Sequence, residues 1–251
     1  MKKFPLSILL AVLSMLGPFA VDTHFPAFSG IANDFGVEKT QIQYTLSAYL
    51  ISSAIMTLVL GPLSDAFGRR KIILAFLGVF FIASFAAIFA QNLEILLICR
   101  TLQGMAGGIG MVLGQAIVRD KMQGAEAQKT MSAISMIFGI APAFAPILGG
   151  YLFVHFGWRS IFLFLCLFAA YNFIVVFFFL EESLKPELRH KFSIKRIFGN
   201  YAIILKKPEF TLRAMAHGFG FAGIGVYICV APTYIIDILK LKETSFGWLF
   251  V

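Results

Sequence analysis

Charged residues are scarce in this chain of 251 residues. Asp, Glu, Lys and Arg together make up 14% of the sequence, apolar residues make up 59%, and the mean hydropathy is +0.85. Soluble domains contain about 25% charged residues, and a soluble fold could not hide this much apolar surface. The scarcity of charge excludes an ordinary soluble domain and predicts a protein that lies in a membrane.

Cysteine is also rare, and its placement suits no chemistry. Cys99, Cys166 and Cys229 each fall inside an apolar run, without the spacing of a metal site. We therefore expect neither disulfides nor zinc and interpret the three residues as small packing side chains. The sequence also offers no nucleophile–base pair, metal-ligand cluster or phosphate-binding glycine loop, so no enzyme, metal centre or cofactor is predicted.

Long apolar runs are what the sequence has in abundance. Each is long enough to cross about 30 Å of hydrocarbon as a helix that rises 1.5 Å per residue. The seven predicted spans are Leu6–Ala27, Ile42–Leu60, Ile72–Ala90, Ile95–Val118, Met131–Val154, Ile161–Leu180 and Phe210–Ala231, and a further run opens at Phe246–Val251. The first is interpreted as an uncleaved helix rather than a signal peptide, because its apolar character continues to Phe28. The predicted fold class is an all-α polytopic membrane protein.

Lys and Arg lie mostly on one side of these spans. If the N-terminus is cytoplasmic, sixteen of the 21 basic residues fall in cytoplasmic segments, four fall on the other side, and Arg100 lies near or inside a span. The positive-inside rule therefore favours a cytoplasmic N-terminus. The net charge of +8 is interpreted as a sign of topology and contact with membrane lipid, not of nucleic-acid binding.

A basic stretch with little apolar continuity divides the chain. We predict a six-helix N-terminal half at 1–180, a cytoplasmic central linker at 181–208, and the start of a second transmembrane half at 209–251. Carriers are commonly built from two six-helix halves. We therefore expect the sequence to be truncated within the second half, and the missing C-terminal helices to be needed for transport.

A charged stretch lies between the second and third runs. We interpret Gly61–Lys71 as a tight turn at one water–lipid boundary, with the residues that follow the fourth run at the same boundary. Ion pairs between these loops could close the cytoplasmic end of a carrier; the alternative is a merely solvated positive loop. The predicted gate residues are Gly61, Asp65, Gly68, Arg69, Arg70, Arg119 and Asp120.

Asp22 lies in apolar surroundings in the first run, between helix-weakening prolines at Pro18 and Pro26. At 1.5 Å per residue it is about 24 Å from the start of that helix, in its outer third. A carboxylate there is costly when it is charged and unpaired, which favours proton uptake, as a proton-coupled carrier requires. The alternative is a hydrated Asp at the membrane surface. His24 is interpreted as a boundary histidine, with proton handling as the alternative.

Two polar stripes predict an internal cavity. Arg100 shares one face of the fourth span with two glutamines and several glycines, and because a guanidinium cannot face lipid cheaply, this face must meet protein or water. A hydroxyl-bearing face of the second span suits an amphipathic ligand, although its hydroxyls could equally bond to their own backbone. The predicted cavity residues are Thr45, Tyr49, Ser52, Gln103, Met111 and Gln115.

The fifth run contains two prolines four residues apart, Pro142 and Pro146, followed by Gly149 and Gly150. Each proline removes a backbone hydrogen bond, so a kink is expected there, and the small residues allow close contact with a neighbouring helix. We interpret this segment as a hinge or a seal.

Taken together, these stretches resemble the major facilitator superfamily and, within it, drug–proton antiporters of the bicyclomycin-resistance (Bcr/CflA) type. The matching stretches are Asp22–Pro26, Gly61–Arg70, Arg100–Gly104, Ala116–Asp120, Pro142–Gly150 and Phe156–Arg159, with Ala145 where the antiporter pattern usually has glycine. The resemblance implies a six-helix bundle of two inverted three-helix repeats. It also implies efflux of drug-like small molecules in exchange for protons, by alternating access across the bacterial inner membrane.

The resemblance further implies roles for individual residues. Asp22 would be the proton acceptor and Arg100 its electrostatic modulator, while Asp65 and Arg69 would belong to the cytoplasmic gate. Two other functions stay open. One is proton-coupled uptake of a sugar or an organic anion, which the pattern of the fifth run argues against. The other is a non-transporting, truncated fragment.

Overall fold

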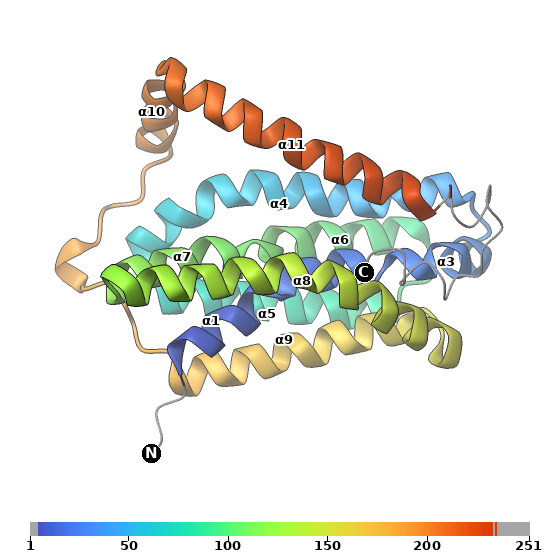
Figure 1. The fold of residues 1–251 in the computed structure, drawn as a ribbon. Helices are drawn as coiled ribbons and strands as arrows, with labels where there is room; N and C mark the ends of the chain where they lie inside the picture. The colour runs from blue at the N-terminus through green and yellow to red at the C-terminus, as the bar shows by residue number, and fades with distance from the viewer. Residues whose placement is uncertain (1–4, 233, 235–251) are drawn as a thin grey trace.

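The computed structural model describes residues 5–232 and 234, and all regular structure within them is helical. In this part of the chain, six helical segments are long and apolar enough to cross a membrane, and they lie side by side as a bundle (Figure 1). The first is interrupted and comprises α1 (Leu6–Ser14), α2 (Leu16–Asp22), η1 (Phe25–Ala27) and α3 (Phe28–Phe35). The others are α4 (Lys39–Phe67), α5 (Arg69–Ile88), α6 (Leu93–Gly107) with α7 (Ile109–Lys121), α8 (Gly124–Phe156) and α9 (Arg159–Phe179). The all-α polytopic fold is thereby confirmed.

The first and fourth spans form the centre of the bundle. In their most apolar windows 61% and 50% of residues are buried, compared with 22% in α4 and in α8. Leu13 of the first span and Leu113 of the fourth belong to one buried core together with Phe80 and Phe162. The polar residues of these two central spans are therefore enclosed by protein on most sides.

Single glycines join two pairs of spans. Gly68, between α4 and α5, has φ of 99°, and Gly157, between α8 and α9, has φ of 77°. Residues with a Cβ rarely adopt such angles, so glycine lets α5 follow α4 after one intervening residue, and α9 follow α8 after two. The prediction of a turn over Gly61–Lys71 was wrong in extent: α4 continues to Phe67 and α5 begins at Arg69.

The second span continues as a helix through Pro62. A proline has no N–H, so the carbonyl four residues earlier, that of Leu58, loses its usual helical partner. Tyr201 of the helix α10 (Ile194–Leu205) donates its hydroxyl to this carbonyl at 2.6 Å. The linker helix thus satisfies the group that the proline leaves free.

The predicted linker is partly helical. After α9 come η2 (Pro186–Leu188), α10 and α11 (Pro208–Pro232) (Figure 1). Ser193 accepts a hydrogen bond from the N–H of Arg196 and so caps the start of α10. Helix α11 coincides with the predicted seventh span, whereas the predicted run Phe246–Val251 lies outside the described residues. The division into domains at 180 and 208 stays a prediction.

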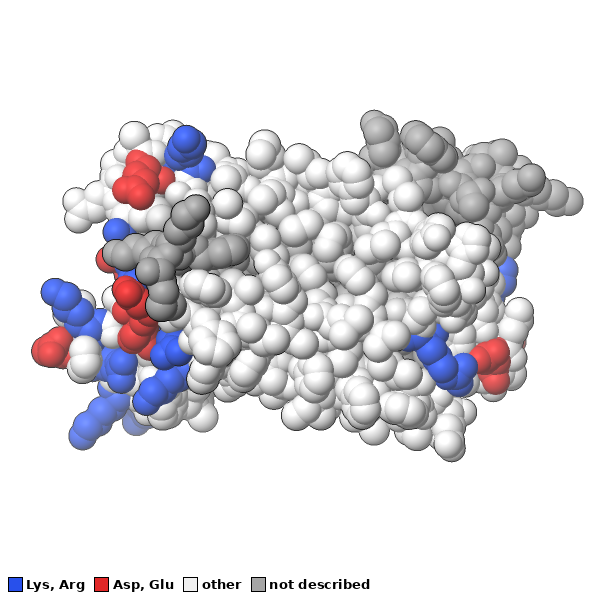
Figure 2. Space-filling model, turned by 90° about the horizontal axis from the view of Figure 1, so that it is seen from below, with Lys and Arg blue, Asp and Glu red and all other residues white. Residues whose placement is uncertain are grey.

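Charged side chains gather at the two ends of the bundle, and an uncharged band separates them on the face shown in Figure 2. We call the end that carries Asp65 and Arg69 the linker end. At the opposite end, Asp34 accepts hydrogen bonds from Trp158 Nε1 and Arg159 Nη1, both at 2.8 Å. This cluster ties the end of the first span to the start of the sixth.

Helix α8 remains one helix through Pro142 and Pro146 and bends in its second half (Figure 1). Beyond the prolines it contacts the interrupted part of the first span. A Cβ placed at position 149 would overlap the backbone of Thr23, and one at position 150 would reach the ring of Pro26. The predicted close helix contact is therefore present, and it lies directly beside Asp22; the hinge role stays a prediction.

Gly149→Ala should destabilise the bundle, because its methyl group has to displace the backbone of Thr23. We expect a loss of about 1–3 kcal/mol in the free energy of unfolding, the usual cost of overpacking. The matched control is Gly139→Ala in the same helix, where a Cβ meets nothing within 4 Å. Denaturant unfolding in detergent micelles compares the two variants, and equal stability would contradict the contact.

Candidate functional site

Asp22 occupies the last residue of α2, directly before the helix is interrupted at Thr23 and His24. Asp22 is only 4% exposed. The first span runs from Leu6 to Phe35, which leaves 16 residues before Asp22 and 13 after it. The prediction that Asp22 lies in the outer third of its helix was therefore wrong. The helical span is longer than its most apolar part, and Asp22 lies near its middle.

Arg100 of α6 is fully buried, and its side chain is the largest among the fully buried ones of the described residues. Its Nη1 donates to the backbone carbonyl of Ala20 at 2.9 Å and to Gln103 Oε1 at 3.0 Å. The guanidinium carbon also lies 4.6 Å from the centre of the Tyr49 ring, a favourable cation–π distance. Arg100 thus joins the two central spans within two residues of Asp22.

Four predicted cavity residues lie in the same interior, packed between helices. Gln103 donates to Ser84 of α5 at 2.8 Å. Thr45 and Ser52 each donate to a carbonyl of their own helix α4, at 2.6 and 3.0 Å, and Tyr49 donates to the carbonyl of Gly17 at 3.4 Å. The reading in which the hydroxyls of Thr45 and Ser52 bond to their own backbone is therefore the observed one. A role in a substrate cavity stays a prediction for all four.

Met111 and Gln115 of α7 lie apart from this interior group and are half-buried. Gln115 donates to the sulfur of Met111 at 3.7 Å, a weak contact within one helix. Between residues 5 and 232, no three His, Cys, Asp or Glu side chains gather closely enough to hold a metal ion. The interior site thus consists of one carboxyl, one guanidinium and neutral polar groups.

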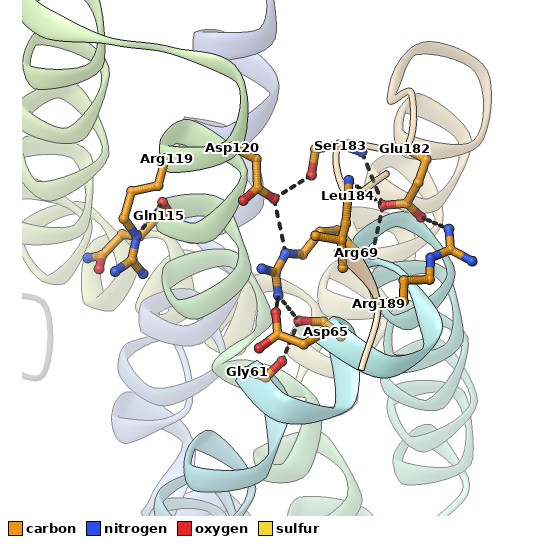
Figure 3. Close-up of polar contacts among 11 residues, drawn as sticks. Gly61, Asp65, Arg69, Gln115, Arg119, Asp120, Glu182, Ser183, Leu184 and Arg189 are labelled. Carbon is orange, nitrogen blue, oxygen red and sulfur yellow. Dashed lines mark hydrogen bonds and ion pairs between the residues drawn. The ribbon is translucent and has the colours of Figure 1, made fainter. Parts of the chain in front are cut away.

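The predicted gate residues Asp65, Arg69 and Asp120 meet at the linker end (Figure 3). Arg69 pairs with Asp65 of α4 through Nη1 and with Asp120 of α7 through Nε, the latter at 3.2 Å. The side chain of Arg69 is only 10% exposed, so water screens these pairs less than it screens an ordinary surface pair. One guanidinium therefore links the ends of the second, third and fourth spans.

The other predicted gate residues lie around this cluster. Gly61 offers only its carbonyl, which accepts from the hydroxyl of Ser64 at 2.8 Å. Arg70 turns to the sixth span, where it donates to the carbonyl of Phe177 at 2.6 Å. Arg119 points away from the cluster and donates to the carbonyl of Gln115 at 3.3 Å (Figure 3). The structure thus separates Arg119 and Arg70 from the ion pairs.

A model of the Major Facilitator Superfamily matches residues 10–251. The chain belongs to this superfamily. Its bundle of membrane-spanning helices, its charged linker end and its buried Asp22 and Arg100 are accordingly parts of a transporter-type protein, and the family is one of transporters, not enzymes.

Curated relatives of this superfamily member include several proteins named for drug resistance. It is 34% identical over 244 residues to the bicyclomycin resistance protein homolog of Haemophilus influenzae, an alignment that covers 96% of this chain and 61% of the relative. It is 27% identical over 249 residues to multidrug resistance protein D of Escherichia coli, covering 98% and 61% of the two chains. The superfamily member therefore spans about three fifths of the length of these relatives.

Solved structures of superfamily transporters share the fold. The human organic anion transporter MFSD10 (TETRAN) superposes with a TM-score of 0.65 at 20% identity, over 98% of this chain and 66% of that one. A D-xylose–proton symporter gives the same TM-score at 15% identity, over 97% and 64%. At these identities the likeness establishes the fold alone.

Residues of the linker also contact the cluster of Asp65, Arg69 and Asp120, and the sequence did not identify them. Glu182 Oε1 accepts the backbone N–H of Arg69 at 2.9 Å and also those of Ser183 and Leu184. The hydroxyl of Ser183 donates to Asp120 at 2.9 Å, and Arg189 approaches Glu182 at 3.8 Å. Their only signal in the sequence was acidic residues at the end of the sixth run, which a solvated linker explains equally well.

Arg69 and Asp120 should couple strongly in a double-mutant cycle. For Arg69→Gln, Asp120→Asn and the double variant we expect a coupling energy of about 1.5–3 kcal/mol, the range for charged hydrogen bonds. The control cycle uses Lys121 and Glu181, a pair at 3.5 Å whose Glu181 side chain is 84% exposed, and should give less than about 1 kcal/mol. Denaturant unfolding in micelles measures both cycles, and equal values would contradict the shielding of the Arg69–Asp120 pair from solvent.

Proposed function

We propose that this protein takes part in proton-coupled efflux of drug-like small molecules across the bacterial inner membrane, by alternating access. The proposal rests first on Asp22, a carboxyl group enclosed near the middle of a membrane span. An ionisable group in that place is costly unless it serves transport or is paired, so it is a natural site for a transported proton. The drug-resistance names of the relatives supply the class of substrate.

Arg100 is proposed to act on Asp22 through the backbone of α2. The guanidinium is held by the carbonyl of Ala20, two residues before Asp22, and by the Tyr49 ring. Because the contact with Ala20 holds the guanidinium within two residues of Asp22, the carboxyl and the guanidinium belong to one electrostatic neighbourhood. A proton that neutralises Asp22 changes the balance of charge in this interior, and such a change can favour one conformation over another.

The linker end is proposed to be cytoplasmic, with the N-terminus on the same side. Basic residues concentrate in the segments at this end, as the positive-inside rule requires of a cytoplasmic surface. At this end Arg69 contacts Asp65, Asp120 and the linker, and these contacts are proposed to hold it closed. Release of these pairs would allow the spans to separate there during transport.

Missing C-terminal helices are proposed to complete the carrier, because the chain spans about 61% of its relatives' length. Substrate sites of such transporters lie between two halves, near the middle of the membrane. Experiments on transport therefore use a carrier of the relatives' length that contains this chain, and experiments on stability use the chain itself.

Asp22→Asn should abolish proton-driven efflux in that carrier, because asparagine cannot release or take up a proton. We expect a loss of at least about tenfold in drug efflux from inverted vesicles or cells under an imposed pH gradient, with normal membrane insertion. Asp22→Glu is the matched control, and it should retain part of the activity. Full efflux by Asp22→Asn would remove Asp22 from the coupling role.

A further inference from the structure

His24 is a second buried polar side chain beside the proposed coupling site, and its tautomer follows from its partner. Its Nε2 lies 3.1 Å from the hydroxyl oxygen of Thr45. That hydroxyl already donates its single hydrogen to the carbonyl of Ile42 at 2.6 Å. The oxygen of Thr45 can therefore only accept from His24, so Nε2 carries the hydrogen.

The other nitrogen of His24 has no partner among the described residues. Nδ1 is buried and unpaired, in a residue that is 1% exposed and lies edge-on to the rings of Phe28 and Phe162. A second proton there would add a second buried cation to the interior that already holds Arg100, which is costly. His24 is thus a neutral imidazole with a free, enclosed acceptor.

Arg100 has the complementary deficit. Its Nε and Nη2 are buried donors without a partner in the described part of the chain, whereas Nη1 serves both Ala20 and Gln103. Buried polar groups are nearly always satisfied by protein or by ordered water. Unpaired donors on Arg100 and an unpaired acceptor on His24 call for a ligand that both accepts and donates hydrogen bonds.

The two side chains lie in adjacent layers of the same helix interface. Arg100 contacts Ala20 of the first span and Tyr49 of α4. His24 follows Ala20 by four residues, and its partner Thr45 precedes Tyr49 by four residues. On the continuous helix α4, the four residues from Thr45 to Tyr49 correspond to about one turn, or about 5.4 Å along the helix axis. Two hydrogen bonds of about 2.8 Å to one water, about 110° apart, join atoms about 4.6 Å apart, a reach that suits side chains anchored one turn from each other.

We propose that Arg100 and His24 bind one buried water between them, which accepts from the guanidinium and donates to His24 Nδ1. This inference rests on the proposed function in one respect: the bound water makes His24 a positioning residue of the coupling site, acting on Asp22 through Arg100. The charged and titratable groups next to these two side chains are Asp22, two residues before His24, and Tyr49, whose ring faces Arg100. Water, rather than a substrate group, is favoured because both side chains face the interior of the bundle and are closed to its surface.

Nitrogen-15 NMR of histidine in this chain, reconstituted in lipid nanodiscs, tests the site without any transport assay. The chain has four histidines, and loss of one set of signals in His24→Gln assigns His24. We expect a neutral imidazole protonated at Nε2, with magnetisation transfer from water to Nδ1. Arg100→Met should abolish that transfer. Three results in the unmodified chain would each overturn the proposal: a hydrogen on Nδ1, an imidazolium at pH 7, or an Nδ1 that has no contact with water.

Two substitutions in the longer carrier separate positioning from folding. His24→Gln places its amide near Nε2 and keeps the contact with Thr45, but it loses the Nδ1 acceptor. His24→Asn places an acceptor near Nδ1 and loses Thr45 instead. We expect His24→Gln to lower efflux at least about fivefold and to move its pH profile, and His24→Asn to keep the pH profile.

If both variants lose activity only in proportion to the amount of folded protein, with unchanged pH profiles, the positioning role is wrong. Nδ1 could instead bind a group of the drug. In that case its NMR signal would show a hydrogen-bond partner only after drug is added, and this result would also overturn the proposal. Absence of proton-driven efflux in the unmodified carrier would reject the proposed function and leave the NMR result on the water site standing.

Discussion

The hydrogen bond from Arg100 to the carbonyl of Ala20 is the interaction on which the centre of the bundle depends. A fully buried guanidinium is tolerated only if its donors are satisfied and its charge is balanced or spread over an aromatic face. Ala20, Gln103 and Tyr49 meet part of that need. The need fixes how the first, second and fourth spans approach one another, and it sets the surroundings of Asp22.

The two ends of the bundle use a common local device at opposite surfaces. Gly68 joins α4 to α5 and Gly157 joins α8 to α9, each with positive φ, and an arginine two residues later contacts a carbonyl or carboxylate of another span. The sequences around them, Phe67-Gly68 and Phe156-Gly157, also match. Such a pair of joints at opposite ends is what two inverted three-helix repeats require.

Several features could be predicted because they depend on local sequence. The number and order of the first six spans follow from the length of apolar runs, and the meeting of Asp65, Arg69 and Asp120 at one end follows from the alternation of helix direction. Other features could not. Helix α4 continues through Pro62 because Tyr201, 139 residues away in the chain, binds the freed carbonyl. Glu182 joins the ion pairs of Arg69 only because the linker folds back onto Arg69.

By itself, the sequence determined that the chain is a helical membrane protein with a charged end, and it singled out Asp22 and Arg100, because charge in an apolar run has few explanations. Only the tertiary structure decided their surroundings. It placed Asp22 near the middle of a span of 30 residues, enclosed Arg100 between two central spans, and turned His24 from a boundary residue into a buried one. Burial and hydrogen-bond partners come from side chains of other spans, which periodicity within one span does not encode.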